Sequence, residues 1–326
     1  MFDDILVVAA AQYELAVALS GYAPIMMIGV ASGLLQDCVL DVPGGVLDLS
    51  RHIAVMAIVN RTPDSFYDRG ATYALDAAVT AGVAAVEAGA EIVDVGGVKF
   101  APGPPVPVED EIARVVPVVR ELAPLTRVSV DTFHPAVAAA AIEAGAAIIN
   151  DTTGLHDPAM ADVVAASGAG VVIAHSLAAP RTQHPLPHYD DVLGDIAAFL
   201  SARRDLALAR GVPADRIVLD PGHDLNKNTR QTLELTRRLD ELAVLGSPLL
   251  VALSNKDFVG ETLDRERGER LPGSLAAAVY CALHGARMVR AHNVRETVDA
   301  LRMVEAILGW REPAYELHNT RPEGND

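Results

Sequence analysis

Short apolar runs recur along the chain, separated by longer stretches in which apolar residues return at helical spacing. The runs are rich in Val, Ile and Ala and nearly continuous in their apolar character, which is typical of parallel strands covered on both faces. They lie at residues 53–60, 91–97, 127–132, 147–152, 170–175, 217–222, 248–254 and 286–292. Each run is therefore predicted to be a buried strand.

The stretches between these runs predict helices. Residues 75–88, 229–245 and 294–308 are clear examples, because their apolar side chains fall on one side of a helix. Eight strand–helix units over about 250 residues have the size and order of a (β/α)8 TIM barrel, so we predict an α/β protein with this fold. A doubly wound open sheet is the alternative. It seldom runs through eight consecutive units, and no Gly-rich phosphate-binding loop follows the first strand.

The flanking segments suggest three regions. We predict an N-terminal extension of uncertain order at 1–45, the barrel domain at 46–310, and a polar C-terminal tail at 311–326. Residues 45–50 are expected to form a small strand or hairpin that closes the bottom of the barrel. A single domain of this length is ordinary for an α/β barrel.

The N-terminal extension contains an uncharged stretch at residues 15–35, which is long enough to count as a membrane-span candidate. Glycines and a proline interrupt the stretch, and no Lys or Arg precedes Arg51. A basic leader and a positive-inside anchor are thus both missing. We therefore expect a packed or poorly ordered extension and no membrane segment.

Composition narrows the classes of partner. The 326 residues are 51% hydrophobic, enough to bury a large core without disulfides. A net charge of −17 argues against nucleic acid or an anionic membrane as a partner, although a local cluster of cations would still permit an anionic small ligand. Cys38 and Cys281 have no metal or redox spacing, so a reduced, cytoplasmic setting is expected.

Candidate chemistry lies at the carboxyl ends of the predicted strands, where barrels of this kind carry their sites. These ends are polar throughout: Asn60, Asp94, Asp131, Asn150, Asp151, His175, Asp220, Ser254, Asn255, Lys256, Arg290 and His292. One such residue alone could merely begin the next helix, as Asp131 could. Polar residues at all eight ends predict a functional rim.

Two groups can be distinguished in this rim. Carboxylates, amides and one cation can bond to the edge of a pterin ring, which presents N–H and amino donors beside a carbonyl acceptor; these residues are Asp94, Asp131, Asn150, Asp220 and Lys256. Asn60, Arg290 and His292 come from the first and last strands, which are neighbours in a closed barrel. They predict an anion site with a metal held by Asn60. The alternative for Arg290 and His292 is salt bridging to the rim carboxylates.

The same positions carry a family resemblance. Residues 59–66 read Val-Asn-Arg-Thr-Pro-Asp-Ser-Phe, which resembles the Asn-x-Thr-Pro-Asp-Ser-Phe signature of dihydropteroate synthase. Further motifs follow in the family's order and spacing: Asp-Val-Gly-Gly at 94–97, Val-Asp-Thr at 130–132, Ile-Asn-Asp at 149–151, Asp-Pro-Gly at 220–222, Leu-Ser-Asn-Lys at 253–256 and Arg-Ala-His at 290–292. The resemblance covers about residues 46–309.

The family joins 6-hydroxymethyl-7,8-dihydropterin diphosphate to 4-aminobenzoate and releases pyrophosphate with the help of Mg2+. The resemblance implies that the pterin is held by Asp94, Asp131, Asn150, Asp220 and Lys256. It implies a site for pyrophosphate and the second substrate at Asn60, Phe66, Arg290 and His292, with Asn60 on the metal. The catalytic residues that it implies are Asp68, Lys256, Arg290 and His292. It also implies a homodimer.

Departures from the family pattern are concentrated in a few segments. The family's second loop reads Glu-Ser-Thr-Arg-Pro-Gly, whereas residues 98–103 read Val-Lys-Phe-Ala-Pro-Gly, so Phe100 and Ala101 replace a Thr and an Arg that grip pyrophosphate. Lys99 is a point charge and does not reproduce the planar guanidinium. Asn255 replaces another Arg, and residues 224–227 replace an aromatic-containing stretch. This combination resembles the divergent second dihydropteroate synthase-like proteins of actinobacteria, which are regarded as lacking the standard activity.

Four hypotheses follow. We favour a pterin-binding protein that is inactive in the condensation or uses another acceptor amine, because losing one preorganised donor costs about 10²–10³ in rate. An active synthase with an unusual loop is the main alternative. A non-catalytic partner protein with the barrel as scaffold is the third. A methyl-tetrahydrofolate methyltransferase is the fourth, although no cobalamin-binding segment is present in the sequence.

Overall fold

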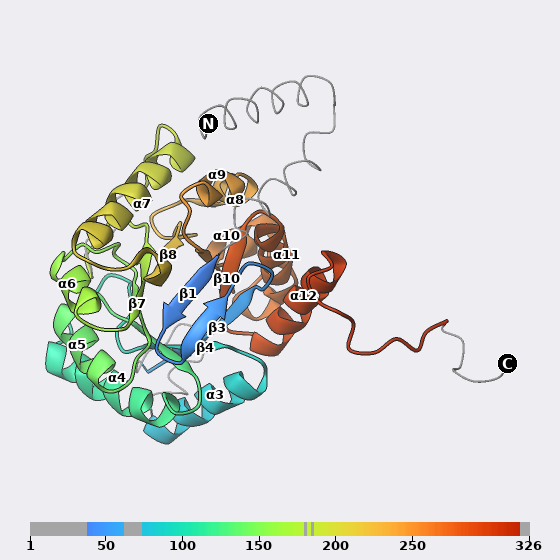
Figure 1. The fold of residues 1–326 in the computed structure, drawn as a ribbon. Helices are drawn as coiled ribbons and strands as arrows, with labels where there is room; N and C mark the ends of the chain where they lie inside the picture. The colour runs from blue at the N-terminus through green and yellow to red at the C-terminus, as the bar shows by residue number, and fades with distance from the viewer. Residues whose placement is uncertain (1–37, 62–73, 179–180, 184–185, 320–326) are drawn as a thin grey trace, which may run out of the picture.

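The computed structural model describes residues 38–61, 74–178, 181–183 and 186–319. Within them, eight parallel strands form a closed barrel in the order β10-β3-β4-β5-β6-β7-β8-β9 (Figure 1). Each strand coincides with a predicted run, and the TIM-barrel prediction is confirmed. The strands are β3 (Ala54–Asn60), β4 (Ile92–Gly96), β5 (Arg127–Asp131), β6 (Ile148–Asp151), β7 (Gly170–Ala174), β8 (Ile217–Asp220), β9 (Leu249–Ala252) and β10 (Ala286–Ala291).

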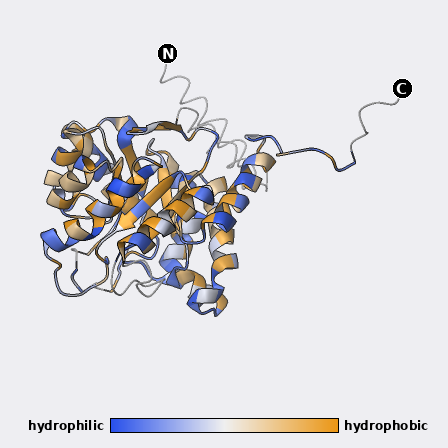
Figure 2. Cartoon of the chain, turned by 90° about the horizontal axis from the view of Figure 1, so that it is seen from below, coloured by the Kyte–Doolittle hydropathy of each residue, from blue (hydrophilic) through white to orange (hydrophobic). Residues whose placement is uncertain are grey.

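Helices surround the barrel. They are α3 (Leu75–Glu87), α4 (Val108–Leu122), α5 (Pro135–Glu143), α6 (Ala159–Ala165), α7 (Val192–Ala209), α8 (Thr229–Arg237), α9 (Asp240–Ala243), α10 (Asp257–Leu263), α11 (Leu271–Leu283) and α12 (Val294–Ile307). Figure 2 shows hydrophobic strands inside this ring of helices. Apolar faces of strands and helices thus meet in one core.

One helix prediction needs correction. Residues 229–245, expected as a single helix, form α8 and α9. Arg238 leaves helical geometry at φ −110° and ion-pairs with Glu234 and Glu241 on either side of the break. Asp240 and Glu241 then occupy the first turn of α9, where acidic side chains are favourable.

The barrel closes where β10 pairs with β3, with Met288 opposite Ala54 and Arg290 opposite Met56. At this closure His52 contacts Glu91 and Glu305 at 2.9 and 3.1 Å. The last predicted strand therefore lies beside the first, as expected.

A hairpin fills the end of the barrel where the strands begin. Strands β1 (Val39–Val42) and β2 (Gly45–Asp48) pair in antiparallel fashion. Leu40 and Val42 belong to one buried cluster with Met56 and Met288 from the barrel interior. The hairpin starts at Val39, inside the range 1–45 that was predicted to be the N-terminal extension. The domain limits themselves remain a prediction.

None of the helices in these described ranges has the length and apolar character needed to cross a bilayer. The uncharged stretch at residues 15–35 lies outside them.

Candidate active site

Asp94 is the centre of a buried hydrogen-bond network inside the barrel. Its side chain is fully buried on β4 and accepts hydrogen bonds from Ser129 Oγ at 2.6 Å, Asn150 Nδ2 at 3.1 Å and Arg290 Nε at 2.7 Å. These donors come from β5, β6 and β10. The Oδ1 atom of Asn150 is buried and has no hydrogen-bond partner among the residues that the structure describes. Because buried polar atoms are normally paired, this oxygen is suited to accept from a ligand.

Arg290 joins two acidic residues. Its Nη2 donates to Asp131 Oδ2 at 3.2 Å while its Nε contacts Asp94. Burial raises the pKa of Asp131 to about 7; Arg290 opposes this rise, and the carboxylates of Asp94, Glu111 and Asp151 reinforce it. The alternative predicted for Arg290, pairing with rim carboxylates, is thus what the structure shows.

His292 makes a different contact. Its backbone N–H donates to Ser254 Oγ at 3.2 Å, and its Nδ1 lies 3.1 Å from the same oxygen. Ser254 therefore orients the imidazole, and the salt bridge considered for His292 remains a prediction.

A cavity of about 380 Å³ opens beside these residues. It is lined by Ile58, Phe100, Ala101, Pro102, Asp224, Leu225, Ala252, Ser254, Asn255, Lys256, Asp257, Arg290 and His292. The lining combines predicted site residues with five positions at which the chain departs from the family pattern: Phe100, Ala101, Asp224, Leu225 and Asn255. Asp94 and Asp131 do not line the cavity, but Arg290 contacts both.

Lys256 lines the cavity and interacts electrostatically with Asp220, a buried carboxylate at the end of β8. Lys256 precedes the first turn of α10, and burial lowers its pKa although Asp224 and Asp220 oppose the change. Burial raises the pKa of Asp220, whose Oδ1 accepts from the backbone N–H of Gly222 at 2.7 Å. Burial thus disfavours the charged form of both groups, and their mutual attraction opposes this effect.

The backbone conformation at position 255 favours asparagine. Its φ of 58° lies in the left-handed region, which Asn tolerates better than most residues. Its backbone N–H donates to Ser274 Oγ at 3.1 Å, and its carbonyl accepts from Arg270 Nη1 at 3.0 Å. An amide therefore replaces a cation in the cavity wall.

Lys227 was missing from the predicted site. Its Nζ lies 2.9 Å from His175 Nδ1 and donates to the carbonyls of Gly222 and Leu225. Burial lowers the pKa of Lys227 to about 7 and that of His175 to about 3, so the imidazole is the neutral acceptor. The position of His175 at a strand end was the one sequence signal for this pair.

Three site residues were predicted at or just after the end of the first strand. Asn60 ends β3, and its Oδ1 would lie only 3.1 Å from a Cβ added to Gly96, so the glycine leaves room for this amide. Phe66 and Asp68 lie outside the described residues. In the part of the chain that the structure covers, no cluster of three or more His, Cys, Asp or Glu side chains has metal-binding geometry.

A closed barrel with a largely apolar cavity that carries a few charged and polar side chains at the strand ends is typical of a small-ligand-binding TIM-barrel protein. The model of the family described as pterin binding enzyme matches residues 56–292, and the chain belongs to that family. Inactive dihydropteroate synthase 2 of Mycobacterium leprae is 48% identical over 79% of this chain and 92% of its own length. The dihydropteroate synthase of Escherichia coli is 40% identical over 82% of this chain and 96% of its own.

Solved structures agree with this assignment. A dihydropteroate synthase of Xanthomonas albilineans with 4-aminobenzoic acid superposes with a TM-score of 0.77 at 40% identity, covering 83% of this chain and 98% of that chain. The Burkholderia cenocepacia synthase complexed with 7,8-dihydropteroate gives a TM-score of 0.75 at 35% identity, with coverage of 83% and 97%. The predicted resemblance is confirmed, including the similarity to the divergent second group: the chain is a dihydropteroate synthase-like protein.

Proposed function

We propose that the chain binds a reduced pterin inside the barrel rim and does not catalyse the condensation with 4-aminobenzoate. One observation carries the proposal: five residues that depart from the family pattern line the same cavity as Lys256, namely Phe100, Ala101, Asp224, Leu225 and Asn255. The inactive relative is 48% identical over most of this chain, which supports the same conclusion.

The barrel interior retains the groups that a pterin edge needs. Asn150 offers an unpaired Oδ1, and Asp131 offers a carboxyl whose pKa of about 7 lets it accept or donate. Lys256 adds a donor in the cavity wall, and Asp220, which interacts with it electrostatically, adds an acceptor. Structures of relatives with 7,8-dihydropteroate support a pterin as the ligand.

The cavity is poorer in cations than a diphosphate-transfer site requires. Phe100 and Ala101 are uncharged, and Arg290 is already paired with Asp94 and Asp131. A guanidinium committed to two carboxylates neutralises less charge on a leaving pyrophosphate. We propose that Mg2+ accompanies the diphosphate at Asn60, since Mg2+ commonly takes one protein oxygen and completes its shell with phosphates and water.

Calorimetry tests this function directly. The protein is titrated with 6-hydroxymethyl-7,8-dihydropterin diphosphate and Mg2+, and 4-aminobenzoate is then added while dihydropteroate is assayed. We expect pterin binding without product above the uncatalysed rate. Asp220→Asn should weaken binding about tenfold by removing a charged acceptor, whereas Asp162→Asn, on the exposed surface, should not. Absence of binding would refute pterin recognition, and turnover would favour the active synthase.

Restoring the family residues gives a second, opposite test. A variant combining Phe100→Thr, Ala101→Arg and Asn255→Arg adds two cations and a hydroxyl to the cavity wall. If these positions limit catalysis, the variant forms dihydropteroate that the parent protein does not. Pterin affinity measured on both proteins serves as the control, because an equal affinity assigns the gain to the chemical step.

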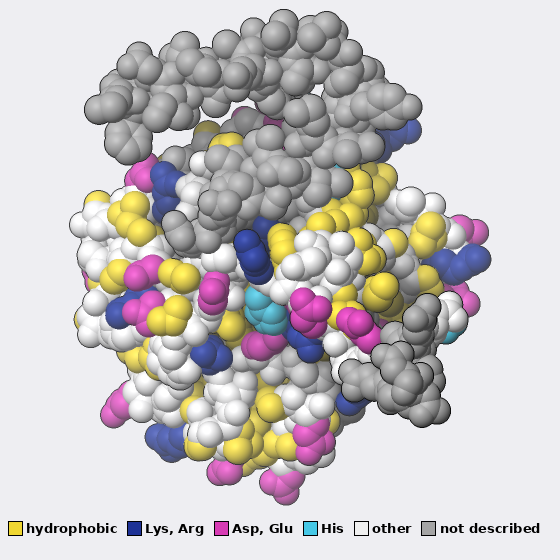
Figure 3. All heavy atoms as spheres, turned by 45° about the vertical axis from the view of Figure 1, so that its right-hand side comes forward, with side chains coloured by type: hydrophobic (Ala, Val, Ile, Leu, Met, Phe, Trp, Pro, Cys, Tyr) yellow, Lys and Arg dark blue, Asp and Glu magenta, His cyan; other side chains and the backbone are white. Residues whose placement is uncertain are grey.

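We also propose a homodimer. Three exposed apolar side chains lie on neighbouring helices: Tyr280 on α11, and Met303 and Ile307 on α12. Hydrophobic side chains are visible between charged ones on the face that comes forward in Figure 3. Sedimentation velocity over a range of concentrations tests the association, and Met303→Glu should weaken it.

A further inference from the structure

The segment between β4 and α4, residues 98–107, is held by an arginine from another strand–helix unit. We call this segment loop two. Arg181, which follows β7, donates from Nη1 to the carbonyls of Lys99 at 2.8 Å and Ala101 at 2.5 Å, and from Nη2 to that of Pro104 at 3.1 Å. In return, the Gly103 N–H donates to the carbonyl of Arg181 at 3.3 Å. The guanidinium thus binds the backbone of loop two at several points.

The two segments are shaped for each other. Arg181 adopts φ 59°, in the left-handed region that costs most residues about 1 kcal/mol or more. Gly103 packs directly against this guanidinium, because a Cβ added there would displace Arg181 Nη2. The strained backbone of Arg181 indicates that the surrounding structure enforces its geometry, and Gly103 allows the guanidinium to approach loop two closely.

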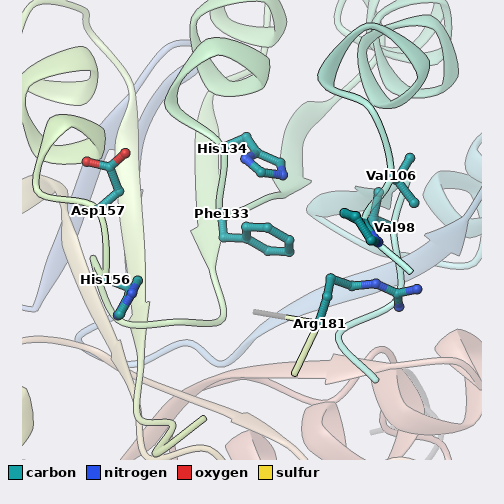
Figure 4. Close-up of a pocket in the computed structure, with 8 residues that line it drawn as sticks. Val98, Val106, Phe133, His134, His156, Asp157 and Arg181 are labelled. Atoms are coloured by element: carbon teal, nitrogen blue, oxygen red, sulfur yellow. The ribbon is translucent and has the colours of Figure 1, made fainter. Parts of the chain in front are cut away.

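Loop two lies between two cavities. Its residues 100–102 line the cavity that contains Lys256 and Arg290. Its residues Val98, Pro105 and Val106 line a second cavity of about 310 Å³, together with Arg181 and side chains that follow β5 and β6. Figure 4 shows the Arg181 side chain extending toward the segment of loop two that contains Val98 and Val106. A segment with a cavity on each side makes fewer packing contacts. Its conformation therefore depends more strongly on its hydrogen bonds.

We propose that Arg181 is a positioning residue that clamps loop two as a preformed wall of the ligand cavity. Its guanidinium forms charge-assisted hydrogen bonds to backbone carbonyls, so the hold on the loop is independent of the loop's side chains. The cavity wall at residues 100–102 is then in place before a ligand arrives. Resting on the proposed function, the clamp slows the departure of a bound pterin.

The first test of the clamp is made on the protein without a ligand. Hydrogen–deuterium exchange is followed for peptides of loop two in the ligand-free wild type, Arg181→Ala, Arg181→Lys and Arg210→Ala. Arg210 is a suitable control, since it bonds to Asp162 on the exposed surface at 2.6 Å. We expect exchange at loop two to rise about tenfold in Arg181→Ala, to rise less in Arg181→Lys, and to stay unchanged in Arg210→Ala. Equal melting temperatures in the four proteins would show that the fold is intact.

The ligand readout is stopped-flow dissociation of 6-hydroxymethyl-7,8-dihydropterin diphosphate. We expect Arg181→Ala to release it about tenfold faster, with association changed less than about twofold. Unchanged exchange at loop two would overturn the clamp, whatever the pterin does. Faster exchange with unchanged dissociation would overturn its role in retention. If the wild type binds no pterin, the proposed function fails, and the exchange experiment still decides the clamp.

Discussion

At the scale of single residues, Asp94 shows how a fully buried carboxylate is stabilised. Three donors from three other strands satisfy its two oxygens, and one of them is a guanidinium. Removing one member of such a buried pair leaves the other charge without compensation, which costs more than the pair itself contributes.

Asp94→Asn should therefore lower the free energy of unfolding by about 3 kcal/mol. The new amide would also point a donor at groups that already donate. Urea denaturation measures the loss. Asp162→Asn breaks an exposed ion pair with Arg210 and should cost less than about 1 kcal/mol. Equal losses in the two variants would show that burial of Asp94 has no energetic importance.

The pKa of Asp131 gives pterin binding a pH dependence. Because this pKa is raised to about 7, the carboxyl is neutral below that pH and ionised above it. An ionised Asp131 is the better acceptor for pterin N–H groups, so affinity should rise as the pH increases from about 6 to about 8. Titrations across this range test the expectation. In Asp131→Asn the rise should vanish, and a rise that persists there must come from another group.

The identity of these residues could be predicted from the sequence, but their partners could not. Strand ends in a barrel face one site, which is why Asp94, Asp131 and Asn150 were predicted together. Whether Arg290 meets an anion or two carboxylates depends on side-chain distances that spacing does not contain. Lys227 and His175 are separated by 52 positions and meet only because of the path of the loop after β8.

At the scale of elements, that loop depends on a tight turn. Gly222 adopts φ 69°, and a Cβ there would overlap the backbone oxygen of His175. Glycine therefore allows the end of β8 to approach the end of β7, where Lys227 and His175 meet.

Gly222→Ala should destabilise the protein by about 3 kcal/mol, because positive φ and a backbone clash act together. Gly246→Ala is a matched control: its φ is 77°, but nothing lies within 4 Å of the added Cβ, so only about 1 kcal/mol of backbone strain is expected. Thermal unfolding of both variants separates the cost of positive φ from the cost of the clash with His175. Similar melting temperatures would mean that the close approach to His175 relaxes without cost.

Element type and order were readable because each strand is covered on both faces and so forms a continuous apolar run. The break between α8 and α9 was not readable, since Arg238 and its two glutamates continue the helical pattern across it.

At the scale of the molecule, a group of charged side chains connects the start of β3, the first strand of the barrel, to α12, the helix that follows the last strand. His52, just before β3, contacts Glu305 on α12 and Glu91 before β4, while Arg302 contacts both glutamates. Hydrogen bonds to Glu305 and Glu91 raise the pKa of His52 to about 9.

This shift links stability to pH. The folded pKa is above the unfolded value of about 6.5, so the contribution of His52 is fully present below about pH 6.5 and is lost as the pH rises toward 9. The stability difference between wild type and His52→Ala should therefore shrink over that interval. Denaturation at several pH values measures it. A difference independent of pH would show that His52 acts by packing alone.

The whole fold could be predicted because the alternation of strands and helices leaves few topologies. The attachment of loop two to Arg181 could not be predicted from the sequence. It depends on a guanidinium that meets backbone carbonyls from a loop three strands away, and backbone acceptors leave no trace in residue type.

Closure of the barrel between β10 and β3 also determines when the site is completed during synthesis. Strand β3 leaves the ribosome early, whereas its partner β10 is near the end of the chain. Until β10 arrives, β3 and β9 present open edges to other chains, and Asp94 lacks the cation supplied by Arg290. The barrel and the ion pair of Asp94 are therefore completed only after residues 286–291 have been made, and we expect a nascent chain that stalls before residue 286 to aggregate more readily.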